Sequence, residues 1–123
     1  MLKIVKSGCG CMLATAALLA AVAPVAAHHG WGSYDAASPV TVDGEIVTSK
    51  YENPHVTLTV KTADGKVWTV TLAPTSRMVN RGALNEMVAV GKKLRAFGYP
   101  SKVEKDEMRA ERITADGKTI EMR

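Results

Sequence analysis

The chain has 123 residues, 46% of them hydrophobic, and carries 16 Lys and Arg against 12 Asp and Glu, a formal net charge of +4 at neutral pH. This length allows one modest domain, and the near balance of charges argues against partners such as nucleic acid or an anionic membrane. Both cysteines, Cys9 and Cys11, lie close to the amino terminus, so no disulfide is expected in the rest of the chain.

The first 27 residues have the three-part organisation of an export signal. Lys3 and Lys6 give a positive start, an apolar run follows over residues 12–23, and small residues precede a predicted cleavage between Ala27 and His28. The apolar run is too short to cross a hydrocarbon core of ~30 Å. We therefore expect a signal peptide over residues 1–27 and a periplasmic or secreted protein with no stable membrane span after cleavage.

After the signal, the sequence predicts an extended leader over residues 28–38 and a single β-rich domain over residues 39–123. Apolar and polar residues alternate from Val40 to Ile46, the period of a half-buried strand, with Gly44 as a bulge or bend. Similar patterns and the turns between them predict five further strands. The six expected strands cover residues 39–51, 56–61, 67–72, 94–99, 108–114 and 119–122.

One short helix is expected between the third and fourth strands. Pro74 stands where a helix begins and Gly82 where it would end, which predicts a helix over residues 74–81. Residues 84–90 predict a further helical turn or irregular structure. This order of elements is typical of a small Greek-key barrel of the oligonucleotide/oligosaccharide-binding (OB) type. We therefore predict a mainly β, OB-like barrel of five to six strands, with a rolled open sheet as the alternative.

Several short motifs of the mature chain resemble those of a known family. They are His28-His29-Gly30-Trp31, Gly44-Glu45-Ile46-Val47, Tyr51-Glu52-Asn53-Pro54-His55-Val56, Arg81-Gly82 and Phe97-Gly98-Tyr99-Pro100. With them the chain resembles a domain-of-unknown-function family of small exported bacterial proteins, whose members pair a His-His start with an aromatic-x-Asn-Pro-His motif. The family has no established activity, so the resemblance implies the fold and the export and leaves the function open.

All three histidines are candidate metal ligands: His28, His29 and His55. An amino-terminal histidine offers a metal both its α-amine and its imidazole, and nitrogen ligands suit copper, zinc and nickel. In one arrangement the amine and ring of His28 join the ring of His55 in a three-nitrogen brace. In another, the amine binds copper together with the amide and ring of His29, with no ligand from the folded domain. Copper is the expected metal, and zinc and nickel are the alternatives.

The brace sets a geometric condition on the leader. The first strand could extend up to ~40 Å, and His55 follows its far end. The leader must therefore fold back along the sheet, or the strand must bend. A separation of more than about 15 Å between the His28 α-carbon and His55 would exclude the brace.

We therefore expect an exported small binding protein that carries or sequesters copper. The alternative is a metal-free barrel that binds a small molecule, a glycan or an envelope protein partner through aromatic residues such as Tyr51, Trp68, Phe97 and Tyr99. A copper-dependent oxidation is the enzyme version of the brace, but a domain this small offers little room for a substrate platform, so we expect a binding protein. No phosphate-binding loop and no serine nucleophile elbow is present in the sequence.

Overall fold

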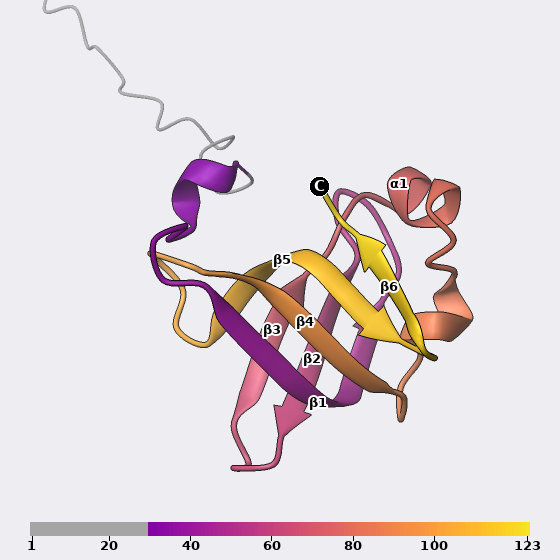
Figure 1. Ribbon diagram of the computed structural model, residues 1–123, viewed down its shortest axis with the longest axis horizontal. Coiled ribbons are helices and arrows are strands. Elements are labelled where there is room, and N and C mark those ends of the chain that lie inside the picture. The colour runs from indigo at the N-terminus through magenta and orange to yellow at the C-terminus, as the bar shows by residue number, and fades with distance from the viewer. Residues whose placement is uncertain (1–29) are drawn as a thin grey trace, which may run out of the picture.

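The computed structural model describes residues 30–123, and the expected signal peptide, His28 and His29 lie outside these described residues. The described chain forms six strands, one short α-helix and two 3-10 turns (Figure 1). In chain order the elements are the 3-10 turn Trp31–Ser33, β1 (Val40–Lys50), β2 (Thr57–Thr62), β3 (Val67–Thr71), α1 (Thr75–Asn80), the 3-10 turn Asn85–Val88, β4 (Lys93–Pro100), β5 (Glu107–Ala115) and β6 (Lys118–Glu121).

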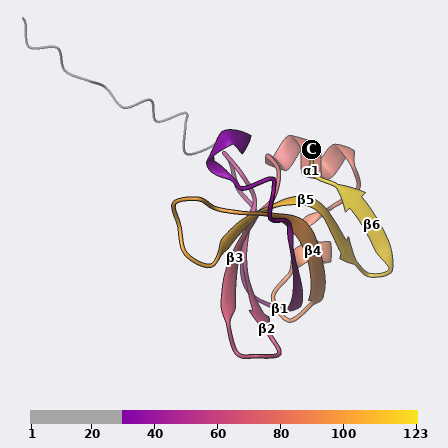
Figure 2. The same cartoon turned by 60° about the vertical axis from the view of Figure 1, so that its left-hand side comes forward.

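Five of the strands close into a barrel. Antiparallel pairs join β1 to β2, β2 to β3, β1 to β4 and β4 to β5, and a parallel pair between β3 and the start of β5 closes the ring. The last part of β5 pairs instead with β6, which extends the sheet beyond the ring (Figure 2). The prediction of a mainly β, OB-like barrel with one short helix between the third and fourth strands is confirmed.

Alternate residues of the strands fill the barrel, as the period of two in the sequence predicts. The largest fully buried side chains include Ile46, Leu58, Leu72, Met78, Leu94, Met108, Ile113 and Met122. They come from both halves of the chain and from α1, so the ring has to close before this core is complete. No cysteine lies within residues 30–123, and the stability of the domain therefore rests on packing.

The bulge expected at Gly44 lies three residues further on. The register of β1 against β2 shifts between Ile46 and Thr48. Gly44 has another reason to lack a side chain, because a Cβ there would overlap the carbonyl oxygen of Lys61 on β2. The glycine therefore permits two backbones to approach closely.

The helix α1 ties the β1–β2 loop to the end of the chain. Pro74 directly precedes it, and Gly82, with φ of 84°, follows it, as the sequence predicts. Met78 of α1 is fully buried in the core, and Arg77 donates a hydrogen bond of 3.1 Å to the Met122 carbonyl. Among residues 30–123, no helix is both long and apolar enough to span a membrane.

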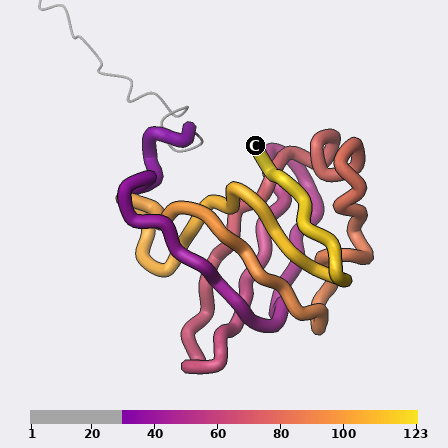
Figure 3. The backbone as a smooth tube through the Cα atoms, viewed as in Figure 1, coloured from indigo at the N-terminus to yellow at the C-terminus, as the bar shows by residue number. Residues whose placement is uncertain are grey.

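The described part of the leader, residues 30–38, lies against the β4–β5 loop (Figure 3). Tyr34 forms an isolated antiparallel bridge with Ser101. The Asp35 N–H donates to the Pro100 carbonyl at 2.9 Å, and a second backbone hydrogen bond, also of 2.9 Å, runs from Lys102 N–H to Ser33. Because of these contacts the chain enters the barrel alongside the loop that precedes β5.

Candidate functional site

A polar cleft lies on the outside of the barrel between two loops. The β1–β2 loop, residues 51–56, provides one wall, the β4–β5 loop, residues 101–106, provides the other, and β2, β3 and β5 provide the floor. The cleft has a volume of about 540 Å³. Its floor consists of Thr57, Thr69, Thr71, Glu107 and Arg109.

Strand register explains why these five side chains share one face. Thr57 pairs with Thr71, and Thr71 pairs with Arg109, so these three form a row across β2, β3 and β5. The next row pairs Thr69 with Glu107. Their chain neighbours Leu58, Val70 and Met108 are fully buried. Since successive side chains point to opposite faces of a sheet, the polar residues face outward.

Tyr34 and Thr71 hold the carboxylate of Glu107 in place. The Tyr34 hydroxyl donates to Glu107 Oε1 at 2.9 Å, and the Thr71 hydroxyl donates to the same oxygen at 3.2 Å. Burial of Tyr34, followed by the hydrogen bond to Glu107 and the charge of Glu107, raises the pKa of the tyrosine to about 12. Tyr34 therefore stays protonated and continues to donate near neutral pH.

Arg109 lies among aromatic side chains at the edge of the cleft. Only 7% of the residue is exposed, and its guanidinium carbon lies 4.2 Å from the Trp31 ring centroid and 6.0 Å from that of Tyr34. Burial lowers the pKa of Arg109, and the charges of Arg77 and Arg123 lower it further, while Tyr34 opposes them. An arginine remains charged under these conditions, so the site contains a fixed cation.

His55 extends from the β1–β2 loop toward this cation. Its Nε2 lies 3.4 Å from an Arg109 guanidinium nitrogen. Arginine can only donate, so Nε2 carries the accepting lone pair in this contact. The loop itself is fixed by Asn53, whose side-chain oxygen accepts hydrogen bonds from the backbone and the hydroxyl of Thr75 at 3.1 and 3.0 Å. A cis peptide joins Asn53 to Pro54.

The structure describes only one of the three predicted metal ligands. His55 lies in the wall of the cleft, while His28 and His29 lie outside the described residues. Within residues 30–123 there is no cluster of three or more His, Cys, Asp and Glu side chains that could hold a metal ion.

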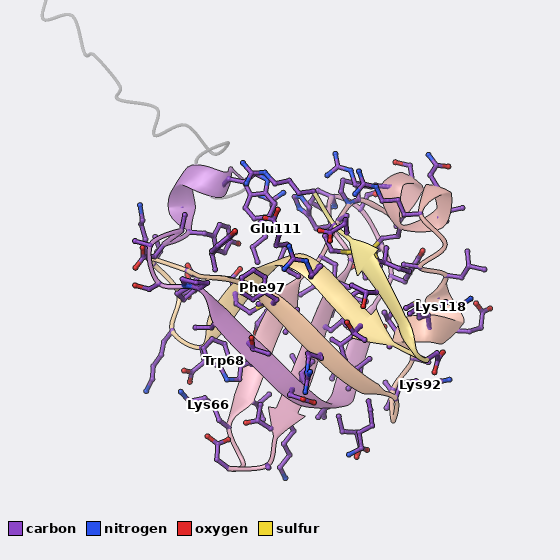
Figure 4. The ribbon with its side chains drawn as sticks, viewed as in Figure 1. Lys66, Trp68, Lys92, Phe97, Glu111 and Lys118 are labelled. Atoms are coloured by element: carbon purple, nitrogen blue, oxygen red, sulfur yellow. The ribbon has the colours of Figure 1, made fainter. Side chains whose placement is uncertain are left out.

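The aromatic residues considered as a ligand platform do not form one surface. The Tyr51 hydroxyl donates to the Ala83 carbonyl at 2.7 Å, and Trp68 packs partly against the core, with the Lys66 amine 5.0 Å from its ring (Figure 4). Phe97 and Tyr99 lie on β4, with ring centroids 6.2 Å apart. The row formed by these two rings continues to Trp31, whose ring centroid lies 6.0 Å from that of Tyr99.

The residues of the cleft floor are not among those predicted from the sequence. Glu107 and Arg109 alternate with the apolar Met108 and Ala110, a signal that the charged pair faces outward. The partners of this pair could not be found in the same way. Thr69 and Thr71 lie almost forty residues earlier and reach β5 only through the parallel pairing that closes the barrel.

The fold and the cleft define a small β-barrel protein with a polar cleft between two loops. Residues 16–109 match the model of DUF6152, described as a family of unknown function, and the chain therefore belongs to that family. The match confirms the resemblance to an uncharacterised family that the motifs indicated. A search of curated proteins found no match.

Proposed function

We propose that this protein is exported and binds copper through the amine and ring of His28 together with the ring of His55, as a carrier or sequestering protein. His29 supplies a further nitrogen next to the new amino terminus. Zinc and nickel suit the same nitrogen ligands, but a tetragonal nitrogen set favours Cu(II) among the common ions. The proposal depends on cleavage between Ala27 and His28.

The observation that carries this proposal is the return of the leader toward His55. The Trp31 ring centroid lies 4.2 Å from the guanidinium carbon of Arg109, and a guanidinium nitrogen of that residue lies 3.4 Å from His55 Nε2. With one C–N bond of about 1.3 Å between them, these distances put the Trp31 ring within about 9 Å of His55 Nε2.

Three peptide units separate His28 from Trp31, and they span at most roughly 11 Å. The amine and ring of His28 are therefore within chain reach of the His55 ring. The described part of the leader runs back toward His55, which supports a brace, while the position of His28 itself lies outside the described residues. It also removes the need for a sharp bend in β1, because the leader itself returns to the cleft.

Copper would take the lone pair of His55 that Arg109 contacts in the described structure. Binding then exchanges a weak hydrogen bond for a metal–nitrogen bond. It also requires neutral nitrogens, and an ordinary imidazole titrates near ~6.5 and an α-amine near ~7.7 to 8.0. We therefore expect copper affinity to rise with pH through this range.

The test is a competition titration of the mature chain, starting at His28, with Cu(II), Zn(II) and Ni(II). We expect one copper ion per chain, with at least tenfold weaker binding after His55→Ala and after acetylation of the α-amine. His29→Ala is the matched control for a terminal peptide site, because that mode needs its ring and amide. Copper binding that is unchanged by His55→Ala but lost in His29→Ala would overturn the brace. Absence of copper binding would overturn the proposed function itself.

A further inference from the structure

The charged residues of the cleft are not paired with one another. Six ion pairs are described among residues 30–123, and none of them includes a residue that lines the cleft. The lining nevertheless carries both signs of charge, on Glu52, Glu104, Glu107, Lys50, Lys105 and Arg109. With three acidic and three basic residues and a neutral histidine, long-range attraction selects neither an anion nor a cation. This lining therefore favours a ligand that itself carries both charges.

Arg109 contributes only its charge to the cleft. Trp31 and Tyr34 cover its guanidinium, which also contacts His55, and only 7% of the residue is exposed. The hydrogen bonds to a ligand must therefore come from other side chains. Both lysines of the lining are exposed, and Glu107 is half-buried.

Glu107 holds a carboxylate oxygen at a fixed position in the cleft. The hydroxyls of Tyr34 and Thr71 both donate to its Oε1, at 2.9 and 3.2 Å. Within residues 30–123, no group is described that donates to its Oε2. An ionised carboxylate can only accept hydrogen bonds, and a charged donor gives a stronger bond than a neutral one. An ammonium group is therefore a favourable partner for Oε2.

Lys105 provides the opposite charge on the neighbouring wall of the cleft. It lies two residues before Glu107, so the two α-carbons are at most ~7 Å apart, yet the two side chains form no described ion pair. Its ammonium can donate to a carboxylate. In an α-amino acid the ammonium and the carboxylate are attached to the same carbon, so one molecule can bridge Glu107 and Lys105.

We propose that this cleft binds a zwitterionic amino compound, namely a free α-amino acid or a short peptide, with its ammonium on Glu107 and its carboxylate on Lys105. The volume of about 540 Å³ lies within the usual range of small-molecule sites. Thr57 and Thr69 of the floor provide polar surroundings for the rest of the ligand. This inference does not rest on the proposed copper site, because it uses neither His55 nor any residue before Gly30.

The experiment is a titration of the mature protein, followed by the backbone amide resonances in two-dimensional NMR. The protein is kept free of metal, because amino acids themselves bind copper. The probes are glutamine, serine and alanine at ~10 mM, a concentration that fills about nine-tenths of a site with a Kd of ~1 mM. We expect at least one of the three to shift the amides of Thr69, Lys105 and Glu107.

Derivatives of the amino acid that binds most tightly test each of its two charges. The N-acetyl derivative lacks the ammonium and should bind at least fivefold more weakly, since hydrogen bonds between charged groups are strong. The amide derivative lacks the carboxylate and should bind about threefold more weakly, because Lys105 is exposed. Its α-amine, with a pKa near ~7.7 to 8.0, is still mostly protonated at pH 7.

Lys105→Gln tests the wall of the cleft without disturbing the barrel. It should weaken binding of the amino acid about threefold and leave binding of its amide derivative unchanged, because variant and derivative remove the same charge pair. The matched control is Lys118→Gln, an exposed lysine on β6 outside the cleft. Glu107→Gln should likewise weaken binding of the amino acid and leave binding of its N-acetyl derivative unchanged.

The remaining outcomes identify the ligand or overturn the proposal. Tighter binding of alanyl-alanine than of alanine assigns the cleft to short peptides, and equal or weaker binding assigns it to free amino acids. Equal affinities for the amino acid and its two derivatives, or equal losses in Lys105→Gln and Lys118→Gln, would overturn the proposal. Absence of shifts with all three amino acids would overturn it too, whatever the outcome with copper.

Discussion

Arg109 contacts the leader and His55 of the β1–β2 loop, and it lies in the floor of the cleft. It faces outward from β5 yet is only 7% exposed, because Trp31 and Tyr34 of the leader cover it. A second arginine, Arg123, lies 4.6 Å from the Trp31 ring. Stacking on aromatic rings stabilises these cations, and it fixes the leader close to His55.

The hydrogen bond between Tyr34 and Glu107 leads to a testable prediction about the pKa of Tyr34. Replacing Glu107 with Gln removes the negative charge that helps to raise the pKa of Tyr34 to about 12. We expect the pKa of Tyr34 to fall part of the way toward 10.0, since burial still raises it. The pKa can be measured by ultraviolet titration of the phenol, with Glu104→Gln, which lies in the cleft but makes no described bond to Tyr34, as the control.

The raised pKa of Tyr34 also determines how the free energy of unfolding changes with pH. Because the folded pKa of Tyr34 lies above the unfolded value, its contribution to the free energy of unfolding is fully present below pH 10 and declines as the pH rises toward 12. In Glu107→Gln, the free energy of unfolding should therefore fall less between pH 10 and pH 12. An unchanged Tyr34 pKa in that variant would contradict the described hydrogen bond.

At the scale of elements, the strands and the helix could be predicted from local pattern. The predicted helix over residues 74–81 matches α1, and each expected strand matches an observed one to within about two residues at either end. The alternation of apolar and polar residues and the turn residues are local signals, so they suffice to predict the strands and the helix. The shift of the bulge from Gly44 to Val47 had no such signal, because it depends on the approach of β2.

The pairing of β4 with β5 depends on a glycine. A Cβ at Gly98 would overlap the carbonyl oxygen of Arg109, and neither backbone can move without breaking the ladder. We expect Gly98→Ala to lower the free energy of unfolding by about 2 kcal/mol or more. In Gly32→Ala the new methyl meets nothing within 4 Å, so the change should stay within about 0.5 kcal/mol. Urea denaturation measures both, and similar losses would contradict the described approach.

The stacking of Trp31 on Arg109 leads to a prediction about how the leader affects copper affinity. Trp31→Ala removes the ring that stacks on Arg109, so the leader should lose its anchor beside His55. Copper affinity should then fall to that of His55→Ala, and the double variant should bind no more weakly than either single one. Phe97→Ala is the control, because the described contacts of that ring are with Tyr99 and with the guanidinium of Arg112, 4.9 Å from its centroid. Unchanged copper affinity in Trp31→Ala would contradict the role of the anchor.

At the scale of the whole molecule, the candidate site forms where distant parts of the chain meet. The leader, the β1–β2 loop, β3 and the start of β5 all contribute to the cleft or its rim. His55 was predicted as a ligand because all three histidines of the sequence lie either at the expected amino terminus of the mature chain or in this loop. It could not predict Glu107 and Arg109, because closure of the barrel brings them beside β3.

Thermal unfolding of the mature chain tests whether one copper ion joins the leader to the barrel. A ligand that binds only the folded state stabilises it by ~2.7 kcal/mol at one hundred times its Kd. For a domain of this size, that corresponds to a rise in Tm of roughly 10–20 °C. A terminal peptide site binds folded and unfolded chains alike and gives no such rise.

We therefore expect copper to raise the Tm of the mature protein by this amount and to leave the Tm of His55→Ala nearly unchanged. The metal-free Tm values of the two proteins provide the baseline, and the variant with acetylated amine should behave like His55→Ala. One-to-one copper binding with no rise in Tm, or an equal rise in His55→Ala, would contradict a copper site shared by the leader and the barrel.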